Sequence, residues 1–215
     1  MPIYESLRRH FGHRGWWPGD TPSEVFIGAV LTQQTTWKNV EKAIANLKEA
    51  DSLSIEGIAN ARISTLERLV RPSGYYRQKA RRLNGVCNTI IREYGTLENM
   101  FALRKEALRN VLLSYNGIGK ETADSIVLYA ANKPVFVIDA YTKRAMSRIN
   151  PEISEDIDYD SLSRYFEDRI DRKLVLYKDF HAQFVELGKN YCKKRNPLCK
   201  KCPLCSICNF GRRSA

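Results

Sequence analysis

Five cysteines near the C-terminus are the residues of this 215-residue chain whose spacing most clearly suggests chemistry. They are Cys192, Cys199, Cys202, Cys205 and Cys208. A disulfide framework usually spreads its cysteines along a secreted chain, so a metal or cluster site is the better interpretation of this grouping. Four thiolates can hold zinc or a 4Fe–4S cluster. The spacing leaves open two ligand sets, one that includes Cys192 and omits Cys205, and one that includes Cys205 and omits Cys192.

A glycine-containing turn, Asn116-Gly-Ile-Gly-Lys120, joins two segments that have helical apolar spacing. Gly117 and Gly119 permit tight, partly left-handed backbone and the close approach of another molecule. The helix that begins near Lys120 directs its free N–H groups and positive dipole end above the turn, a place that suits a phosphate. This arrangement predicts a helix-hairpin-helix, which holds a DNA backbone without reading its sequence. An ordinary turn between two helices is the alternative.

The charge of the chain indicates the class of its partner. There are 35 Lys and Arg against 24 Asp and Glu, a net charge of +11, which favours a polyanion such as nucleic acid. Residues 62–82 and 187–215 are strongly basic, whereas 150–171 hold eight acids and two arginines. One charged run is usually only a solvated face. Two basic segments and one acidic segment together suggest a polarised molecule with one side that faces DNA.

No segment of the sequence suggests a membrane or a secretory route. No apolar run approaches the ~20 residues that a membrane span needs, and residues 1–10 lack the apolar core of a signal peptide. We therefore expect a cytoplasmic protein without a membrane partner. The length predicts one to two domains at ~150 residues each.

Helices must position these residues, because apolar residues recur at three- and four-residue spacing along most of the chain. The periodic segments are 25–31, 40–48, 66–70, 80–93, 104–115, 121–131, 141–149, 159–170 and 175–189. Thr21-Pro22-Ser23-Glu24 offers a helix cap followed by proline at the first helical position. The one β-like run, 135–138, is too short to build a sheet. The sequence therefore predicts an all-α protein with two helical lobes.

With the cysteine spacing and the hairpin together, residues 20–208 resemble the helix-hairpin-helix DNA glycosylases of the endonuclease III superfamily. The resemblance is greatest to the endonuclease III-like 3-methyladenine DNA glycosylases. It implies a two-lobed all-α fold, with a hairpin domain of residues 20–133 and a second domain of residues 1–19 plus 134–215. It implies a C-terminal iron–sulfur loop at 192–208, in which a 4Fe–4S cluster is held by Cys192, Cys199, Cys202 and Cys208. The implied partner is double-stranded DNA that contains damaged bases, bound by a monomer.

The resemblance also assigns roles to single residues. Gln34, in Leu31-Thr-Gln-Gln-Thr35, matches the glutamine that fills the gap left by a flipped base, and Tyr75 matches a wedge against the opposite strand. Asp139 matches the catalytic aspartate, although an aspartate before a helix is also a common N-cap. The hairpin residues implied to bind DNA are Asn116, Gly117, Gly119, Lys120 and Thr122.

Two departures from the family pattern define the expected activity. Members with lyase activity carry a nucleophilic lysine immediately before the Thr-Ala of the hairpin, and this chain has Glu121 there. Adenine-specific mismatch glycosylases carry a glutamate at the place near Ala29, which has no acid here. We therefore expect a monofunctional glycosylase for alkylated purines. The alternatives are an endonuclease III-type glycosylase/lyase for oxidised pyrimidines and a non-catalytic iron–sulfur DNA-binding protein.

Aromatic residues are the candidates for the base pocket, because a cationic alkylated purine gains from aromatic faces. Core packing is the alternative role for each of them. Glu121 could line the pocket or could simply favour the N-terminus of a helix, and the two roles are equally open. The candidates for the pocket are Trp16, Trp17, Trp37 and Glu121, with Tyr4 as a further aromatic residue. The three histidines, His10, His13 and His181, show no metal-binding spacing and are expected to be surface or core residues.

Overall fold

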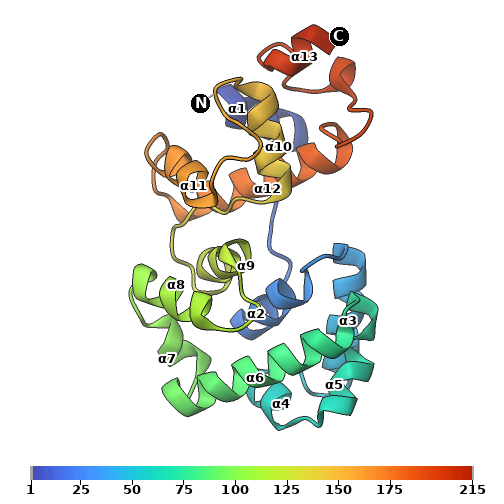
Figure 1. Ribbon diagram of the computed structural model, residues 1–215, viewed down its shortest axis with the longest axis vertical. Coiled ribbons are helices and arrows are strands. Elements are labelled where there is room, and N and C mark those ends of the chain that lie inside the picture. The colour runs from blue at the N-terminus through green and yellow to red at the C-terminus, as the bar shows by residue number, and fades with distance from the viewer. Residues whose placement is uncertain (1, 215) are drawn as a thin grey trace. The chain divides into compact units, whose positions relative to one another are not determined.

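The computed structural model describes residues 2–214, and within this range it contains helices and no strand, which confirms the all-α prediction (Figure 1). Residues 134–139, which include the β-like run, have no regular secondary structure. The chain divides into two compact units. One unit comprises residues 18–133, and the other comprises residues 1–17 together with 134–215.

Helix α2 (Pro22–Leu31) is the centre of the unit of residues 18–133, because every residue from Glu24 to Leu31 is buried. Its N-terminus is capped as the sequence predicts, with Thr21 Oγ1 accepting a hydrogen bond of 3.1 Å from the Glu24 N–H. The elements packed against α2 are α3 (Trp37–Glu49), α6 (Tyr76–Tyr94), α9 (Lys120–Ser125) and the π-helical turn η2 (Ile126–Ala130).

The longest helix of this unit, α6, packs against two short helices, α4 (Ile55–Asn60) and α5 (Ile63–Leu69). A 3₁₀ turn, η1 (Arg71–Ser73), leads into α6, and α7 (Leu97–Phe101) and α8 (Lys105–Ser114) follow it. The periodicity of the sequence did not reveal α4 or α7. Their six and five residues make fewer than two turns at 3.6 residues per turn, which is too short for an apolar face to recur.

Helix α12 (Leu174–Asn190) is the core of the other unit, where it packs against α1 (Pro2–Phe11) and α10 (Ala140–Ile149). The remaining elements are α11 (Tyr159–Glu167), the 3₁₀ turn η3 (Cys199–Lys201) and α13 (Asn209–Ser214). Phe180 and Phe184 of α12 stack with ring centroids 4.9 Å apart. Gly188 allows α10 to approach closely, because a Cβ atom there would collide with the ring of Tyr141.

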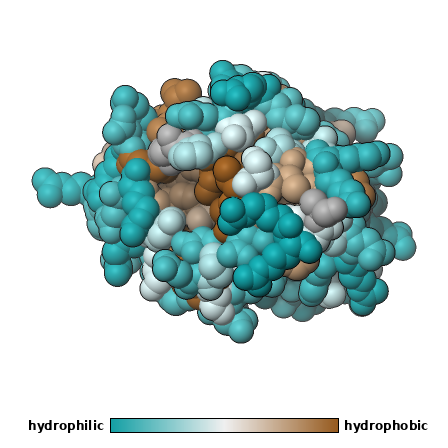
Figure 2. All heavy atoms as spheres, turned by 90° about the horizontal axis from the view of Figure 1, so that it is seen from above, coloured by the Kyte–Doolittle hydropathy of each residue, from teal (hydrophilic) through white to brown (hydrophobic). Residues whose placement is uncertain are grey.

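None of the helices in residues 2–214 is long and apolar enough to cross a bilayer. Figure 2 shows a mainly hydrophilic face with small, separate apolar patches.

Candidate functional site

Asp139 precedes α10, and its carboxylate is held from two sides. Oδ1 accepts hydrogen bonds from the Thr142 N–H (2.7 Å) and the Thr142 hydroxyl (2.8 Å), so Asp139 caps α10. Oδ2 lies 3.7 Å from Nε2 of His181, which α12 contributes. The residue is only 8 % exposed. The cap therefore occupies one oxygen and leaves the other beside a titratable ring.

The surroundings of Asp139 favour its ionised form. Burial by itself raises the pKa of this carboxyl, but the interaction with His181 and the two hydrogen bonds from Thr142 outweigh burial and hold the pKa below its usual value. Asp139 is thus a buried carboxylate at neutral pH. Such a group can stabilise positive charge that develops on a bound molecule, because little water screens it.

His181 is a site residue that the sequence analysis missed. His10 and His13 are exposed, which agrees with the expectation that they are surface residues. His181 is buried, at 4 % exposure, and faces Asp139. Nothing in the spacing of the sequence connects the two residues. Their contact arises because α10 packs on α12.

The predicted hairpin lies between α8 and α9. Gly117 has a φ of +84°, the left-handed backbone that glycine permits. Gly119 is extended instead, with a φ of −90°. A Cβ atom at Gly119 would meet nothing within 4 Å, so its face of the turn is open to another molecule. Asn116 and Glu121 are exposed beside it, and Lys120 is half-buried.

Two side-chain contacts that the sequence did not suggest hold the hairpin in place. Arg109 of α8 donates two hydrogen bonds to the buried carboxylate of Asp124 in α9, from Nε (2.6 Å) and Nη2 (3.2 Å). Gln33 donates from Nε2 to the Gly117 carbonyl (2.8 Å) and to the Thr122 hydroxyl (3.0 Å). Thr122 is consequently buried, so its hydroxyl serves the internal structure of the turn rather than an open surface.

Gln34 and Tyr75 stand at the tips of two loops and share an unusual backbone. Both residues have positive φ, +53° and +46°, although neither is glycine. Left-handed backbone at such residues costs about 1–3 kcal/mol and is concentrated at functional sites. Gln34 is exposed between α2 and α3, and Tyr75 is 65 % exposed before α6, an unusual position for a large aromatic side chain. Both tips are therefore shaped to project side chains outward.

The aromatic candidates belong to both compact units. Trp16 and Trp17 adjoin with ring centroids 5.5 Å apart, and the ammonium of Lys189 lies 5.2 Å from the Trp16 ring centroid. Trp37 belongs to the unit of residues 18–133, where its indole N–H donates to Glu41 (2.8 Å). The Tyr4 hydroxyl donates to Asp179 (2.8 Å) and the Tyr4 ring contacts Phe180. These contacts agree with core packing, the alternative role of Tyr4.

The five C-terminal cysteines line one small cavity. Burial, with a smaller contribution from nearby thiols, raises the pKa of Cys202 to about 11. Cys205 is close as well, because its N–H donates to the Cys202 carbonyl (3.0 Å). The cavity therefore leaves both ligand sets open.

Thiolates are ligands of both zinc and 4Fe–4S clusters, so the donor chemistry of this cavity suits an inorganic group. Within residues 2–214, no three His, Cys, Asp or Glu side chains are arranged to hold a single ion.

Helix α10 connects this cysteine loop to Asp139. Arg144 Nε donates to the Cys192 carbonyl (2.8 Å), and Arg148 Nη1 donates to the Lys193 carbonyl (2.8 Å) and lies 3.3 Å from the Cys192 sulfur. One helix thus carries Asp139 at its first turn and anchors the cysteine loop at its last. The loop is in this way part of the structure that fixes the carboxylate.

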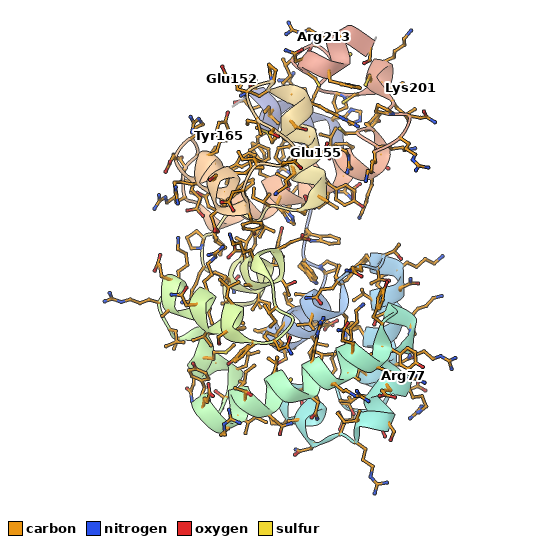
Figure 3. All side chains as sticks on the ribbon, in the orientation of Figure 1. Arg77, Glu152, Glu155, Tyr165, Lys201 and Arg213 are labelled. Carbon is orange, nitrogen blue, oxygen red and sulfur yellow. The ribbon has the colours of Figure 1, made fainter. Side chains whose placement is uncertain are left out.

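Both predicted basic segments present cations to solvent. Figure 3 shows Lys201 and Arg213 extending from the C-terminal part of the chain and Arg77 extending from α6. Lys79 is the exception in segment 62–82, because it is only 2 % exposed.

The chain is similar to known DNA repair proteins along most of its length. The sequence profile of the HhH-GPD superfamily base excision DNA repair proteins matches residues 27–172. A protein of Methanocaldococcus jannaschii named as a DNA repair glycosylase is 47% identical over 208 residues, which are 96% of this chain and 94% of that protein. Endonuclease III of Thermotoga maritima is 30% identical over 198 residues, which are 89% of this chain and 84% of that enzyme.

Solved structures have the same fold. The 3-methyladenine DNA glycosylase of H. pylori, bound to 1,N6-ethenoadenine, matches with a TM-score of 0.75 and 33% identity, over 87% of this chain and 95% of that one. An endonuclease III–DNA complex matches with a TM-score of 0.84 over 99% of this chain and 94% of that one. At 23% identity the latter likeness concerns the fold alone.

Proposed function

The chain belongs to the HhH-GPD superfamily and is a base excision repair DNA glycosylase, and from this premise we propose that it is monofunctional and releases alkylated purines of the 3-methyladenine type. The observation that carries the proposal is the second residue of α9. Glu121 stands there in place of the lysine that would attack the sugar in a lyase. Lys120, one residue earlier, is displaced by about 100° around the helix axis, so we expect its side chain to point elsewhere.

The first task of the protein is to hold DNA with one base outside the stack, because the glycosidic bond is inaccessible inside a duplex. The open face at Gly119 and the N–H groups of α9 would bind backbone phosphates without reading sequence. Gln34 would occupy the space that the base leaves. Tyr75 would press against the opposite strand.

The second task is to help the bond between the sugar and the base to break. The sugar gains positive charge as the base departs, and the ionised Asp139 would stabilise that charge and orient the attacking water. Oδ2 is the oxygen available for this role, since Thr142 occupies Oδ1.

The proposed substrate class follows from what the site lacks as well as from what it contains. An N-alkylated purine is already cationic and leaves without a strong protonating acid, which agrees with the absence of a carboxylate at Ala29. The adjoining rings of Trp16 and Trp17 would give such a cation aromatic faces. The 33% identity to a 3-methyladenine glycosylase supports the same class.

We also propose that Cys192, Cys199, Cys202 and Cys208 hold a 4Fe–4S cluster. When bound, such a cluster would cross-link the C-terminal loop and stabilise it. The loop itself presents Lys200 and Lys201 to DNA phosphates.

A glycosylase with lyase activity on oxidised pyrimidines is the second candidate. It is favoured by the 30% identity to endonuclease III, which covers 89% of this chain. The difference between the two candidates is an amine nucleophile that attacks the sugar.

One experiment separates these candidates. Duplex DNA treated with a methylating agent is incubated with the protein, and free bases and strand breaks at abasic sites are measured in the same tube. Release of 3-methyladenine with intact abasic strands is the expected result. Strand nicking, together with a covalent adduct trapped by borohydride, would instead establish the lyase.

A further inference from the structure

We propose that Lys79 is a positioning residue that couples the two DNA-entering loops, so that Gln34 and Tyr75 enter the duplex as one unit. The inference rests on the proposed function, because it assumes that both side chains enter DNA. It adds a residue that contacts no DNA and has no place in the chemistry described above.

The contacts of Lys79 connect the two loops directly. Its side chain crosses the interior of the unit of residues 18–133 at 2 % exposure. The ammonium donates one hydrogen bond to the Leu31 carbonyl (2.9 Å) and another to the Ser73 carbonyl (2.6 Å). Within residues 2–214 the ammonium makes these two hydrogen bonds and has no carboxylate partner.

Each accepting carbonyl lies at the base of one loop. Leu31 is the last residue of α2, and the loop that carries Gln34 begins after it. Ser73 is the last residue of η1, two positions before Tyr75. Carbonyls at a helix C-terminus lack intrahelical donors and carry partial negative charge, so an ammonium suits both positions.

Lys79 remains a cation in the interior of its unit. Burial lowers the pKa of this lysine to about 8, so the side chain is still mainly cationic at neutral pH. Burying a cation is unfavourable, and Lys79 offsets this cost by donating to two carbonyls at the ends of helices. The same two hydrogen bonds connect the backbones of two loops that both have left-handed tips.

The consequence is cooperative entry into DNA. A shift of the Ser73 carbonyl moves the ammonium, and the ammonium moves the Leu31 carbonyl. If Tyr75 is seated in the duplex, the Gln34 loop is held in its entering position, and the reverse is equally true. Loss of either side chain should therefore weaken the contribution of the other.

A double-mutant cycle tests this coupling without disturbing Lys79. Binding is measured to a duplex that contains a tetrahydrofuran abasic-site analogue with 2-aminopurine opposite it, whose fluorescence reports unstacking. This duplex makes the test independent of the base that the enzyme removes. Gln34→Ala and Tyr75→Ala should each reduce the affinity for this DNA. The fold-loss of affinity in the double variant should be at least about threefold smaller than the product of the two single fold-losses.

Lys79→Met then removes the connection. We expect it to abolish the coupling between Gln34 and Tyr75 and to reduce the unstacking signal at saturating DNA. Ile90→Ala is the matched control, because Ile90 is buried in the same helix about eleven residues, or roughly 16 Å, beyond Lys79. It should lower stability and leave the coupling unchanged. If Lys79→Met does not fold, Lys79→Gln, which can satisfy one carbonyl, should reduce the coupling in part.

The outcomes distinguish the inference from the function on which it rests. A wild-type protein that does not bind or unstack the abasic duplex overturns both. A wild-type protein that unstacks it, but in which Gln34→Ala and Tyr75→Ala are additive, overturns the coupling alone. Equal loss of coupling in Lys79→Met and Ile90→Ala also overturns it, since general destabilisation would then explain the effect.

Discussion

The replacement Asp139→Asn separates the charge of this residue from its structural role. An asparagine side chain is as good an N-cap as aspartate, and its carbonyl oxygen can accept both hydrogen bonds from Thr142 that Oδ1 now accepts. The helix start should therefore persist. The substitution removes the negative charge beside His181 and little else.

The magnitude follows from the burial of the site. Two unit charges about 4 Å apart interact by about 4 kcal/mol at the effective dielectric constant of about 20 that suits partly buried pairs. At 8 % exposure, bulk-water screening does not apply to Asp139. If this interaction forms mainly in the transition state, its loss corresponds to about a thousandfold in the rate of base release.

The assay is single-turnover release of 3-methyladenine from methylated duplex DNA, with DNA affinity and thermal unfolding measured on the same preparation. Asp158→Asn is the matched control, because Asp158 caps α11 through the Ser161 N–H (3.0 Å) at an exposed position. It should leave all three quantities nearly unchanged. Base release by Asp139→Asn within tenfold of the wild-type rate, with the fold intact, would refute the catalytic role of this carboxylate.

Three further predictions concern the surroundings of the site. His181→Gln should raise the pKa of Asp139, which the ring now lowers, so the acidic limb of the pH–rate profile should move to higher pH. An unmoved limb would contradict this reasoning. Asp124→Ala removes the buried carboxylate that accepts two hydrogen bonds from Arg109 and should reduce the free energy of unfolding in urea by about 2–4 kcal/mol. A loss below about 1 kcal/mol would show that the pair contributes little. Cys205→Ser should keep the broad visible absorption of an iron–sulfur protein, and loss of that absorption would place Cys205 among the ligands.

The sequence by itself determined the helical class, the position of most helices and the hairpin. These features are local, because apolar spacing, the Thr21-Pro22 cap and the left-handed requirement at Gly117 act within a few residues of each other. The same locality explains why α4 and α7 were missed, since they are too short for a period to appear. Helix α1 was also missed, although it has ten residues. The C-terminal cysteine grouping was also visible in the sequence, although its occupant was not.

Only the tertiary structure decided which side chains meet. The contacts of Asp139 with His181, of Arg109 with Asp124 and of Lys79 with two carbonyls join elements that are separate in the sequence. A buried polar side chain has to find a partner wherever packing supplies one. Sequence spacing does not contain that information across loops and helices. From the sequence, Lys79 belongs to a basic segment that is expected at the surface. The fold instead buries the Lys79 ammonium between the bases of two loops.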